Sequence, residues 1–319
     1  MEQFGILSLG SRLKRLSDFL YSEVQAVYGN ESLMISSTYF PILRLLQQEC
    51  SLSVVQISER LGLSHPAVSK QVAKMLKEGL LLKIQDESDL RRSAICLSEL
   101  SQQEMHKAEP VLMAIGMELD FYLRQLSGPF LMQLEGLESK LLNGPYAKRV
   151  ILRLHPELLE IRDCQSSEDY AAFKALNMAW LERFFSDDIY EKDHLLLNNP
   201  ETHILAKGGK VKVATLDNKA IGTYFIMPTD RNMMELGKLA VDERFQRLGV
   251  GERLLEDAIS AATAMNAVAL VLESHTLLEP ALGLYQKFGF AVDSSSSSFS
   301  VPRANIRMIK HLGGSHERL

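Results

Sequence analysis

The stretch ELGKLAVDERFQRLGVG, residues 235–251, contains the most informative pattern in the second half of the chain. Its first part belongs to an apolar run that predicts a strand over about 233–241, and its end has the order Gln-x-x-Gly-x-Gly. Apolar side chains then recur at helical spacing from Val250 to Ala262, so we expect a helix to begin directly behind the glycines. Glycines allow close approach of the backbone, and a helix N-terminus presents free N–H groups and positive dipole charge. The stretch therefore predicts an anion site.

Strands and helices alternate on both sides of this stretch. Ser166 and Asp169 have capping-box spacing, which predicts the start of a helix over 166–185. Another short helix is expected at 189–198 and a helix ended by Gly289 at 280–290. The remaining segments are expected to be strands: 158–164, 203–216, 219–227, 268–272 and 305–309.

The first half of the chain has mostly helical periodicity. Ser53 and Gln56 form a second capping-box pattern, and the helix that they open is expected to end at Gly62. Ser64 can cap a following helix that has one apolar face and one polar, basic face. Two short strands, 80–84 and 93–97, flank a charged tip at 86–92. A helix-turn-helix followed by a hairpin is a winged helix.

Charge is distributed unevenly along the chain. The net charge is −5, which gives no general reason to expect a nucleic-acid partner. Between Arg60 and Arg92, however, seven Lys/Arg stand against four Asp/Glu. Positive charge is thus concentrated where an element that contacts phosphates would lie.

Length and composition indicate two globular domains in one chain of 319 residues, of which 46% are hydrophobic. The Asn143-Gly-Pro145 break separates them, so we expect domains at 1–142 and 158–319 with a linker at 143–157. Three scattered cysteines argue for a reducing cytoplasm and against a metal site, so no metal is expected. No segment has the pattern of a signal peptide or of a membrane span, so we expect a cytoplasmic protein without a membrane partner.

Residues 10–142 resemble the MarR family of winged-helix regulators, on the run from Val54 through Leu97 with the tip Asp86…Asp89-Leu90-Arg91-Arg92. The resemblance implies a double-stranded DNA operator and a homodimer formed by the first and last helices, about 11–29 and 99–141. It also implies that the wing arginine is Arg91 or Arg92. The expected DNA-facing residues of the second helix are Ser64, His65, Ala67, Ser69, Lys70, Gln71 and Lys74.

Residues 158–312 resemble the GNAT superfamily of acetyl-CoA-dependent N-acyltransferases, on the loop 246–251 and the later Leu-Tyr-x-x-x-Gly-Phe pattern around Tyr285. The resemblance implies an α/β fold with a mixed, mostly antiparallel sheet. It implies that Tyr285 is the general acid and that Glu235, 14 residues before the first loop glycine, is a candidate base for the amine acceptor. The residues implied to bind acetyl-CoA are Leu239, Ala240, Val241, Gln246, Arg247, Leu248, Gly249, Val250 and Gly251.

The sequence thus predicts a regulator joined to an N-acetyltransferase, and two other functions remain open. The second domain could bind acetyl-CoA or an amine and tune DNA affinity without significant catalysis. Alternatively, the winged helix could only dimerise an enzyme. Trp180, Phe184 and Phe185 are expected in the core of their helix, with the acceptor pocket as their other possible place, and His275 is expected in a loop.

Overall fold

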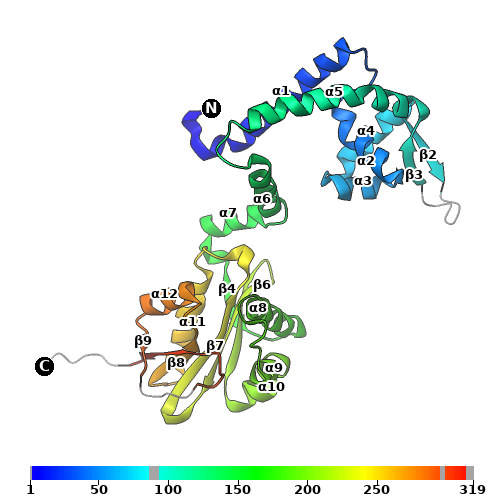
Figure 1. Cartoon of the computed structure of the whole chain (residues 1–319). Helices are drawn as coiled ribbons and strands as arrows, with labels where there is room; N and C mark the ends of the chain where they lie inside the picture. Colours follow the sequence, from blue (N-terminus) through cyan, green and yellow to red (C-terminus); the bar gives the residue numbers. More distant parts are fainter. Residues whose placement is uncertain (1, 86–92, 295–298, 314–319) are drawn as a thin grey trace. The chain divides into compact units, whose positions relative to one another are not determined.

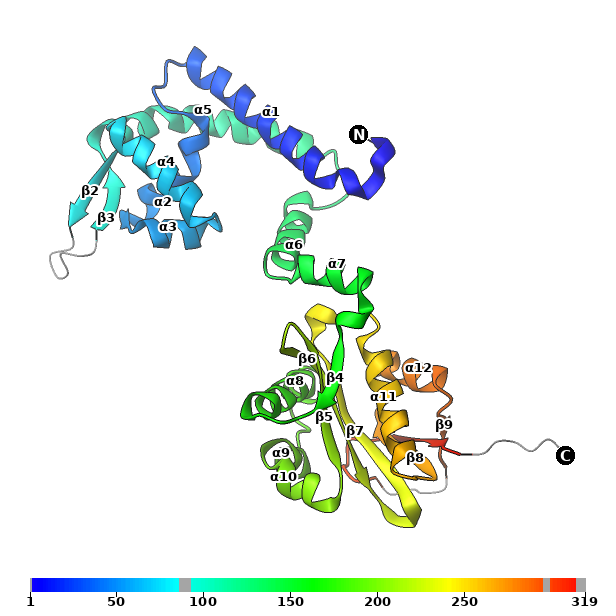
Figure 2. The same cartoon turned by 180° about the vertical axis from the view of Figure 1, so that it is seen from behind.

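The computed structural model describes residues 2–85, 93–294 and 299–313. The chain divides into two compact units, Met1–Glu135 and Gly136–Leu319, which Figures 1 and 2 show from two sides. Helix α6 (Phe130–Leu142) contains the point of division. Within the described ranges, no helix combines the length and the apolarity that crossing a membrane requires.

The N-terminal unit is a winged helix. Its three short strands form an antiparallel sheet in the order β1-β3-β2. Helices α3 and α4 form the helix-turn-helix, and β2 and β3 form the hairpin that follows it. The wing tip, with Arg91 and Arg92, lies outside the described residues. The elements are α1 (Leu9–Asn30), α2 (Phe40–Glu49), β1 (Ser51–Leu52), α3 (Val54–Leu61), α4 (His65–Lys77), β2 (Leu81–Gln85), β3 (Ser93–Leu97) and α5 (Glu99–Leu123), with 3₁₀ turns at Glu2–Ser8 and Ser37–Tyr39.

The local signals of the helix-turn-helix act as expected, with one exception. The Gln56 amide donates to Ser53 Oγ at 3.2 Å, and the Ser53 amide donates to Gln56 Oε1 at 2.9 Å. Gly62 ends α3 in the left-handed conformation, with φ 63°. Ser64 stands at the N-cap of α4, but its side chain makes no capping hydrogen bond. The buried face of α4 consists of Val68, Val72 and Met75.

The C-terminal unit is built on a seven-stranded sheet in the order β4-β5-β6-β7-β8-β10-β9. Among the strand pairs of the described residues, only β7–β8 is parallel, so the expected mixed, mostly antiparallel sheet is confirmed. The strands are β4 (Glu160–Asp163), β5 (Lys210–Leu216), β6 (Lys219–Pro228), β7 (Met233–Val241), β8 (Ala269–Ser274), β9 (Ala291–Val292) and β10 (Ile306–His311). The helices are α7 (Tyr146–Leu154), α8 (Ser167–Phe185), α9 (Glu191–Asn198), α10 (Pro200–His203), α11 (Val250–Ala264) and α12 (Glu279–Lys287), with 3₁₀ turns at Pro156–Leu158, Leu205–Lys207, Asp230–Asn232 and Glu243–Phe245.

Helices cover both faces of this sheet. Helices α8, α9 and α10 lie on one side, and α11 and α12 lie on the other (Figures 1 and 2). Leu254 and Ala258 of α11 pack in a core cluster with Leu270 of β8, whereas Phe173 of α8 packs with Phe225 of β6 in a second cluster. One core cluster thus lies on each face of the sheet, between the strands and the helices. The ends of the strands are left for a binding site.

Two segments differ from the sequence-based expectation. The strand expected over 203–216 begins only at Lys210, because Pro200 opens a helical turn and Gly208, with φ 80°, ends the next one. The expected linker 143–157 is largely the helix α7, and Leu152 of that helix is buried in the core of the C-terminal unit. The nine residues of α7 are strongly amphipathic, and a helix places their apolar side chains on one face, which an extended connection would not do.

Candidate active site

The sheet opens between β7 and β8. Their parallel pairing covers three residue pairs and ends at Glu235 and Val271, so the rest of β7 faces a gap. On its other edge, β7 keeps its pairing with β6, but the register shifts between Thr223 and Phe225. The extra residue on β7 places Lys238 at φ 52°, which is the signature of a β-bulge. The bulge and the short pairing together create a V-shaped opening in an otherwise continuous sheet.

The loop after β7 presents free backbone donors. Arg247 and Gly249 both have left-handed backbone, with φ 62° and 78°. Helix α11 begins at Val250, and its first bond of the i→i−4 type runs from the Arg253 amide to the Gly249 carbonyl at 3.0 Å. The amides from 248 to 252 find no acceptor among the residues that the structure describes. Such a row of free amides at a helix N-terminus suits an anion.

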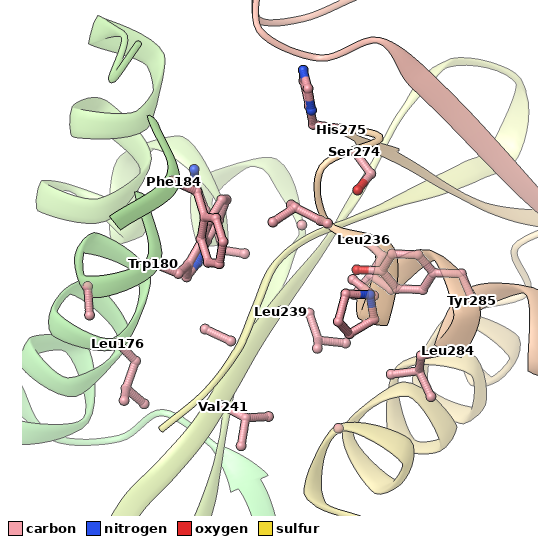
Figure 3. Close-up of a pocket in the computed structure, with 18 of the residues that line it drawn as sticks. Leu176, Trp180, Phe184, Leu236, Leu239, Val241, Ser274, His275, Leu284 and Tyr285 are labelled. Atoms are coloured by element: carbon pink, nitrogen blue, oxygen red, sulfur yellow. The ribbon is translucent and has the colours of Figure 1, made fainter. Parts of the chain in front are cut away.

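A cavity of about 1160 Å³ joins the opening of the sheet to this loop. Figure 3 shows Trp180 and Phe184 of α8 on one side, Leu239 and Val241 of β7 in the middle and Tyr285 of α12 on the other side. The loop residues Gln246, Arg247, Gly249, Val250 and Gly251 and the strand residues Leu239, Ala240 and Val241 all line it. Leu248 does not line the cavity but packs against the core.

Tyr285 lies in this cavity with its hydroxyl unpaired. The residue is 8% exposed, and its ring stands 5.8 Å from the ring of Phe290. Its hydroxyl makes no hydrogen bond with any described residue and is drawn toward Leu239 in Figure 3. Burial raises the pKa of Tyr285 to about 12. The hydroxyl therefore keeps its proton at neutral pH.

Glu235 lies on the cavity wall at the point where β7 and β8 separate. Burial raises the pKa of this carboxyl, the nearby Glu273 charge raises it further, and the Lys192 charge lowers it. Glu235 has no ion pair and no hydrogen bond within the described part of the chain. A desolvated carboxylate without a partner is a more effective base than an exposed one.

A buried ion group lies beside Glu235, and no sequence pattern predicted it. Asp193 of α9 is 1% exposed and pairs with both Lys238 of the bulge and Arg303. Arg303 Nη2 donates to Asp193 Oδ1 at 2.7 Å, and these cations hold the pKa of Asp193 well below its usual range. The three residues are distant in sequence and share no spacing pattern, so only the fold brings them together.

The wall that faces Tyr285 is aromatic. Trp180, Phe184, Phe185 and His275 all line the cavity. The core position expected of the α8 aromatics is confirmed for Phe185, which is 6% exposed, and for Trp180, which packs against the same cluster, but it is wrong for Phe184, which is 45% exposed. The Trp180 indole donates to Asn177 Oδ1 at 3.0 Å, and the Lys238 ammonium lies 5.8 Å from the Trp180 ring centre. These contacts fix the orientation of the wall.

The expected DNA-binding residues share the exposed surface of α4, with two engaged in local contacts. Ser64, His65, Ala67, Ser69 and Lys70 are exposed. Gln71 is half-buried, and its amide donates to the Thr38 carbonyl at 2.5 Å. The Lys74 ammonium lies 5.5 Å from the Tyr39 ring centre and 3.8 Å from Glu78.

No group of three or more His, Cys, Asp or Glu that could hold a metal ion occurs in the described ranges. Cys50 is exposed and Cys96 and Cys164 are partly buried, and none of the three forms a disulfide. Burial raises the pKa of the Cys164 thiol to about 12, which makes it unreactive as a nucleophile.

Comparison with known proteins identifies a family for each unit. The acetyltransferase (GNAT) family model matches residues 170–290, and the MarR family model matches residues 35–93. The uncharacterized N-acetyltransferase YvbK of Bacillus subtilis (strain 168) is 29% identical over 117 residues, which cover 36% of this chain and 74% of that protein.

Solved structures of acetyltransferases also align with this chain. One from Staphylococcus aureus Mu50 is 23% identical with a TM-score of 0.45, covering 49% of this chain and 99% of its own. An acetyltransferase from Streptococcus agalactiae 2603 is 17% identical with a TM-score of 0.44, covering 48% and 98%. From the two family matches, the chain is a fusion of a MarR-family domain with a GNAT-family N-acetyltransferase domain.

Proposed function

We propose that the C-terminal domain transfers an acetyl group from acetyl-CoA to an amine acceptor by direct attack of the amine on the thioester. The row of free amides from 248 to 252, next to the open edge of β7, is the observation that supports this proposal most directly. These amides suit the pyrophosphate of the cosubstrate, and the edge at Leu239 to Val241 suits its extended pantetheine arm. Gly249 supplies the left-handed backbone with which the chain turns into α11.

The proposed chemistry needs three protein groups. Glu235 takes the proton of the acceptor ammonium, directly or through one water. A backbone amide at Leu239 or Ala240 donates to the thioester oxygen as negative charge develops on it. Tyr285 donates its proton to the departing sulfur. The unpaired states of the Glu235 carboxylate and the Tyr285 hydroxyl support these roles, because neither group must break a bond within the protein before it reacts.

Calorimetric titration of the full chain with acetyl-CoA tests the cosubstrate. We expect one site per chain in the wild type. Gly249→Val should weaken binding because its side chain disfavours the left-handed backbone by about 1–2 kcal/mol. Gly29→Val, on the N-terminal helix, is the matched control. Absence of heat in the wild type would refute the proposed cosubstrate.

For the N-terminal domain we propose binding of a double-stranded DNA operator through α4, as a transcriptional regulator. The exposed face with His65, Ser69 and Lys70 supports this, since nothing in the described unit covers it. Gel-shift titration with genomic fragments that flank the gene tests it, and a loss of affinity at high salt is expected for phosphate contacts. Salt-independent or absent binding would favour a winged helix that only dimerises the enzyme.

We also propose a homodimer formed by the N-terminal unit. Large apolar side chains are exposed along α1 and α5, including Leu16 and Phe19 at 48% and 58% and Met117 and Phe121 at 73% and 59%. An apolar surface of this kind on two long helices that pack on each other suits a second copy. Light scattering should give twice the 35.8 kDa chain mass, and a monomer at micromolar concentration would refute the dimer.

A sensor without significant catalysis is the alternative function. In that case, acetyl-CoA or an amine would change operator affinity, and the operator would change ligand affinity by the same factor. Turnover that is clearly above the rate of an Glu235→Gln/Tyr285→Phe double variant would favour the enzyme.

A further inference from the structure

The helix α7 touches the loop that follows β7. The Arg149 guanidinium donates from Nη1 to the Arg244 carbonyl and from Nη2 to the Gln246 carbonyl, the latter at 3.2 Å. In the opposite direction, Arg253 in the first turn of α11 donates to the Pro156 carbonyl just after α7. Two arginines thus tie the α7 segment to both sides of the free-amide row.

Helix α7 is itself firmly attached to the C-terminal unit. Leu152 is 2% exposed within the core cluster that also contains Val250 and Leu254 of α11. Lys148 pairs with Asp217 of the β5–β6 turn at 2.6 Å. Arg149 is therefore presented to the loop by a fixed helix rather than by a free chain, and a planar guanidinium with two donors suits two neighbouring carbonyls.

The loop needs such support. Arg247 has a left-handed backbone without being glycine, which costs about 1–2 kcal/mol. The start of the loop is anchored from outside, because the Asp242 amide donates to the Ile221 carbonyl at 2.8 Å and Arg183 pairs with Glu243. The backbone amides of Phe245 and Gln246 instead make short-range bonds, to Asp242 O at 2.8 Å and to Glu243 O at 3.3 Å. Arg149 holds the carbonyl groups of Arg244 and Gln246. The free amides at 248–252 follow directly after these residues in the chain.

We propose that Arg149 is a positioning residue of the acetyl-CoA site, so that α7, which lies outside the residues matched by the acetyltransferase family model, is a working part of this enzyme. The inference rests on the proposed function, because it assigns the loop to acetyl-CoA. Arg149 acts through the loop: it keeps the peptides at 244–247 in the conformation that directs the next amides toward the pyrophosphate. Its positive charge also favours an anion bound nearby.

The test compares three single variants of the full chain. Arg149→Ala removes both donors, Arg149→Lys keeps the charge without the planar pair of donors, and Lys148→Ala removes the neighbouring ion pair that does not touch the loop. Acetyl-CoA affinity is measured by calorimetry, and the exchange of the Phe245 and Gln246 amides is measured by hydrogen–deuterium exchange without ligand. Thermal midpoints serve as the folding control.

We expect Arg149→Ala to weaken acetyl-CoA binding about tenfold, with faster exchange at Phe245 and Gln246. Arg149→Lys should recover part of the affinity, and Lys148→Ala should stay within about twofold of the wild type. Wild-type binding that Arg149→Ala leaves unchanged would overturn the inference alone. Equal losses of acetyl-CoA affinity in Arg149→Ala and Lys148→Ala, with equal drops in thermal midpoint, would also overturn the inference. They would show that α7 only stabilises the domain. No binding by the wild type would overturn the proposed function as well.

Discussion

Replacing Tyr285 with phenylalanine removes one hydroxyl and leaves the ring in place. The ring keeps its contact with Phe290, and no hydrogen bond within the described residues is lost. The hydroxyl borders the cavity and is not among the buried polar atoms that lack a partner, so its removal should leave the free energy of unfolding nearly unchanged. The thermal midpoint of Tyr285→Phe is therefore expected not to fall, and acetyl-CoA affinity should be retained.

Catalysis should respond in the opposite direction. A positioned general acid contributes about 10²–10⁴-fold, so we expect kcat to fall at least about 100-fold, or about 2.7 kcal/mol in activation free energy. Because burial raises the pKa of Tyr285 to about 12, the hydroxyl keeps its proton up to about pH 10. The loss in kcat should therefore be the same at every pH from about 6 to 10.

Loss of thioester absorbance at saturating acetyl-CoA, with the fastest acceptor from a panel of primary amines, measures kcat across this pH range. Calorimetry on the same samples measures the acetyl-CoA Kd. A variant with kcat within about twofold of the wild type would refute the role of Tyr285 as proton donor. Equal losses in kcat and affinity would show instead that the ring environment had changed.

Three further substitutions test other parts of the molecule. Burial raises the pKa of Glu235, and a base must be deprotonated, so wild-type kcat should fall as the pH decreases through a value above the usual range for a glutamate. Glu235→Gln should abolish this acidic limb of the pH–rate profile. The same variant should slightly raise the free energy of unfolding at pH 7, because it removes a buried charge. Asp193→Asn leaves Lys238 and Arg303 without their shared anion, and urea unfolding should show a loss of about 3–5 kcal/mol; a loss below about 1 kcal/mol would contradict a buried ion group. Lys70→Ala should weaken operator binding and lower the slope of log affinity against log salt by about one, and an unchanged slope would place the phosphate contact elsewhere.

Local rules predicted most elements of the fold. The Ser53–Gln56 capping box and the left-handed Gly62 set the ends of α3, because both depend on residues within a few positions of each other. The strand β7 has the expected bounds, 233–241, and the helix behind the glycines begins at Val250 as expected. Short-range patterns of this kind need no knowledge of the tertiary structure.

The features that the sequence did not reveal depend on contacts between segments that are distant in the chain. The segment 143–157 follows a Gly-Pro break, which favours a linker, yet burial of Leu152 makes its helix part of the C-terminal unit. The pairing of Asp193 with Lys238 joins residues 45 positions apart, and no periodicity connects them. Tyr285 and Glu235 were named as candidates because the resemblance to the GNAT superfamily implies them, but their lack of hydrogen-bond partners could be learned only from the structure.

The bulge at Lys238 explains why a strained backbone and a buried charge occur together beside the open edge. An alternating strand would continue its pairing with β8 past Glu235 and close the sheet where the cavity lies. The extra residue prevents this, but it leaves Lys238 with a positive φ and a side chain directed into the protein, where burial lowers the pKa of its ammonium. Asp193 of α9 compensates the buried charge of Lys238, and Arg303 pairs with Asp193 in turn. The carboxylate of Asp193 is therefore fully engaged, while that of Glu235, on the same strand as Lys238, is left free. A buried ion group that satisfies itself thus allows a neighbouring carboxylate to remain unpaired, which is the state that a base requires.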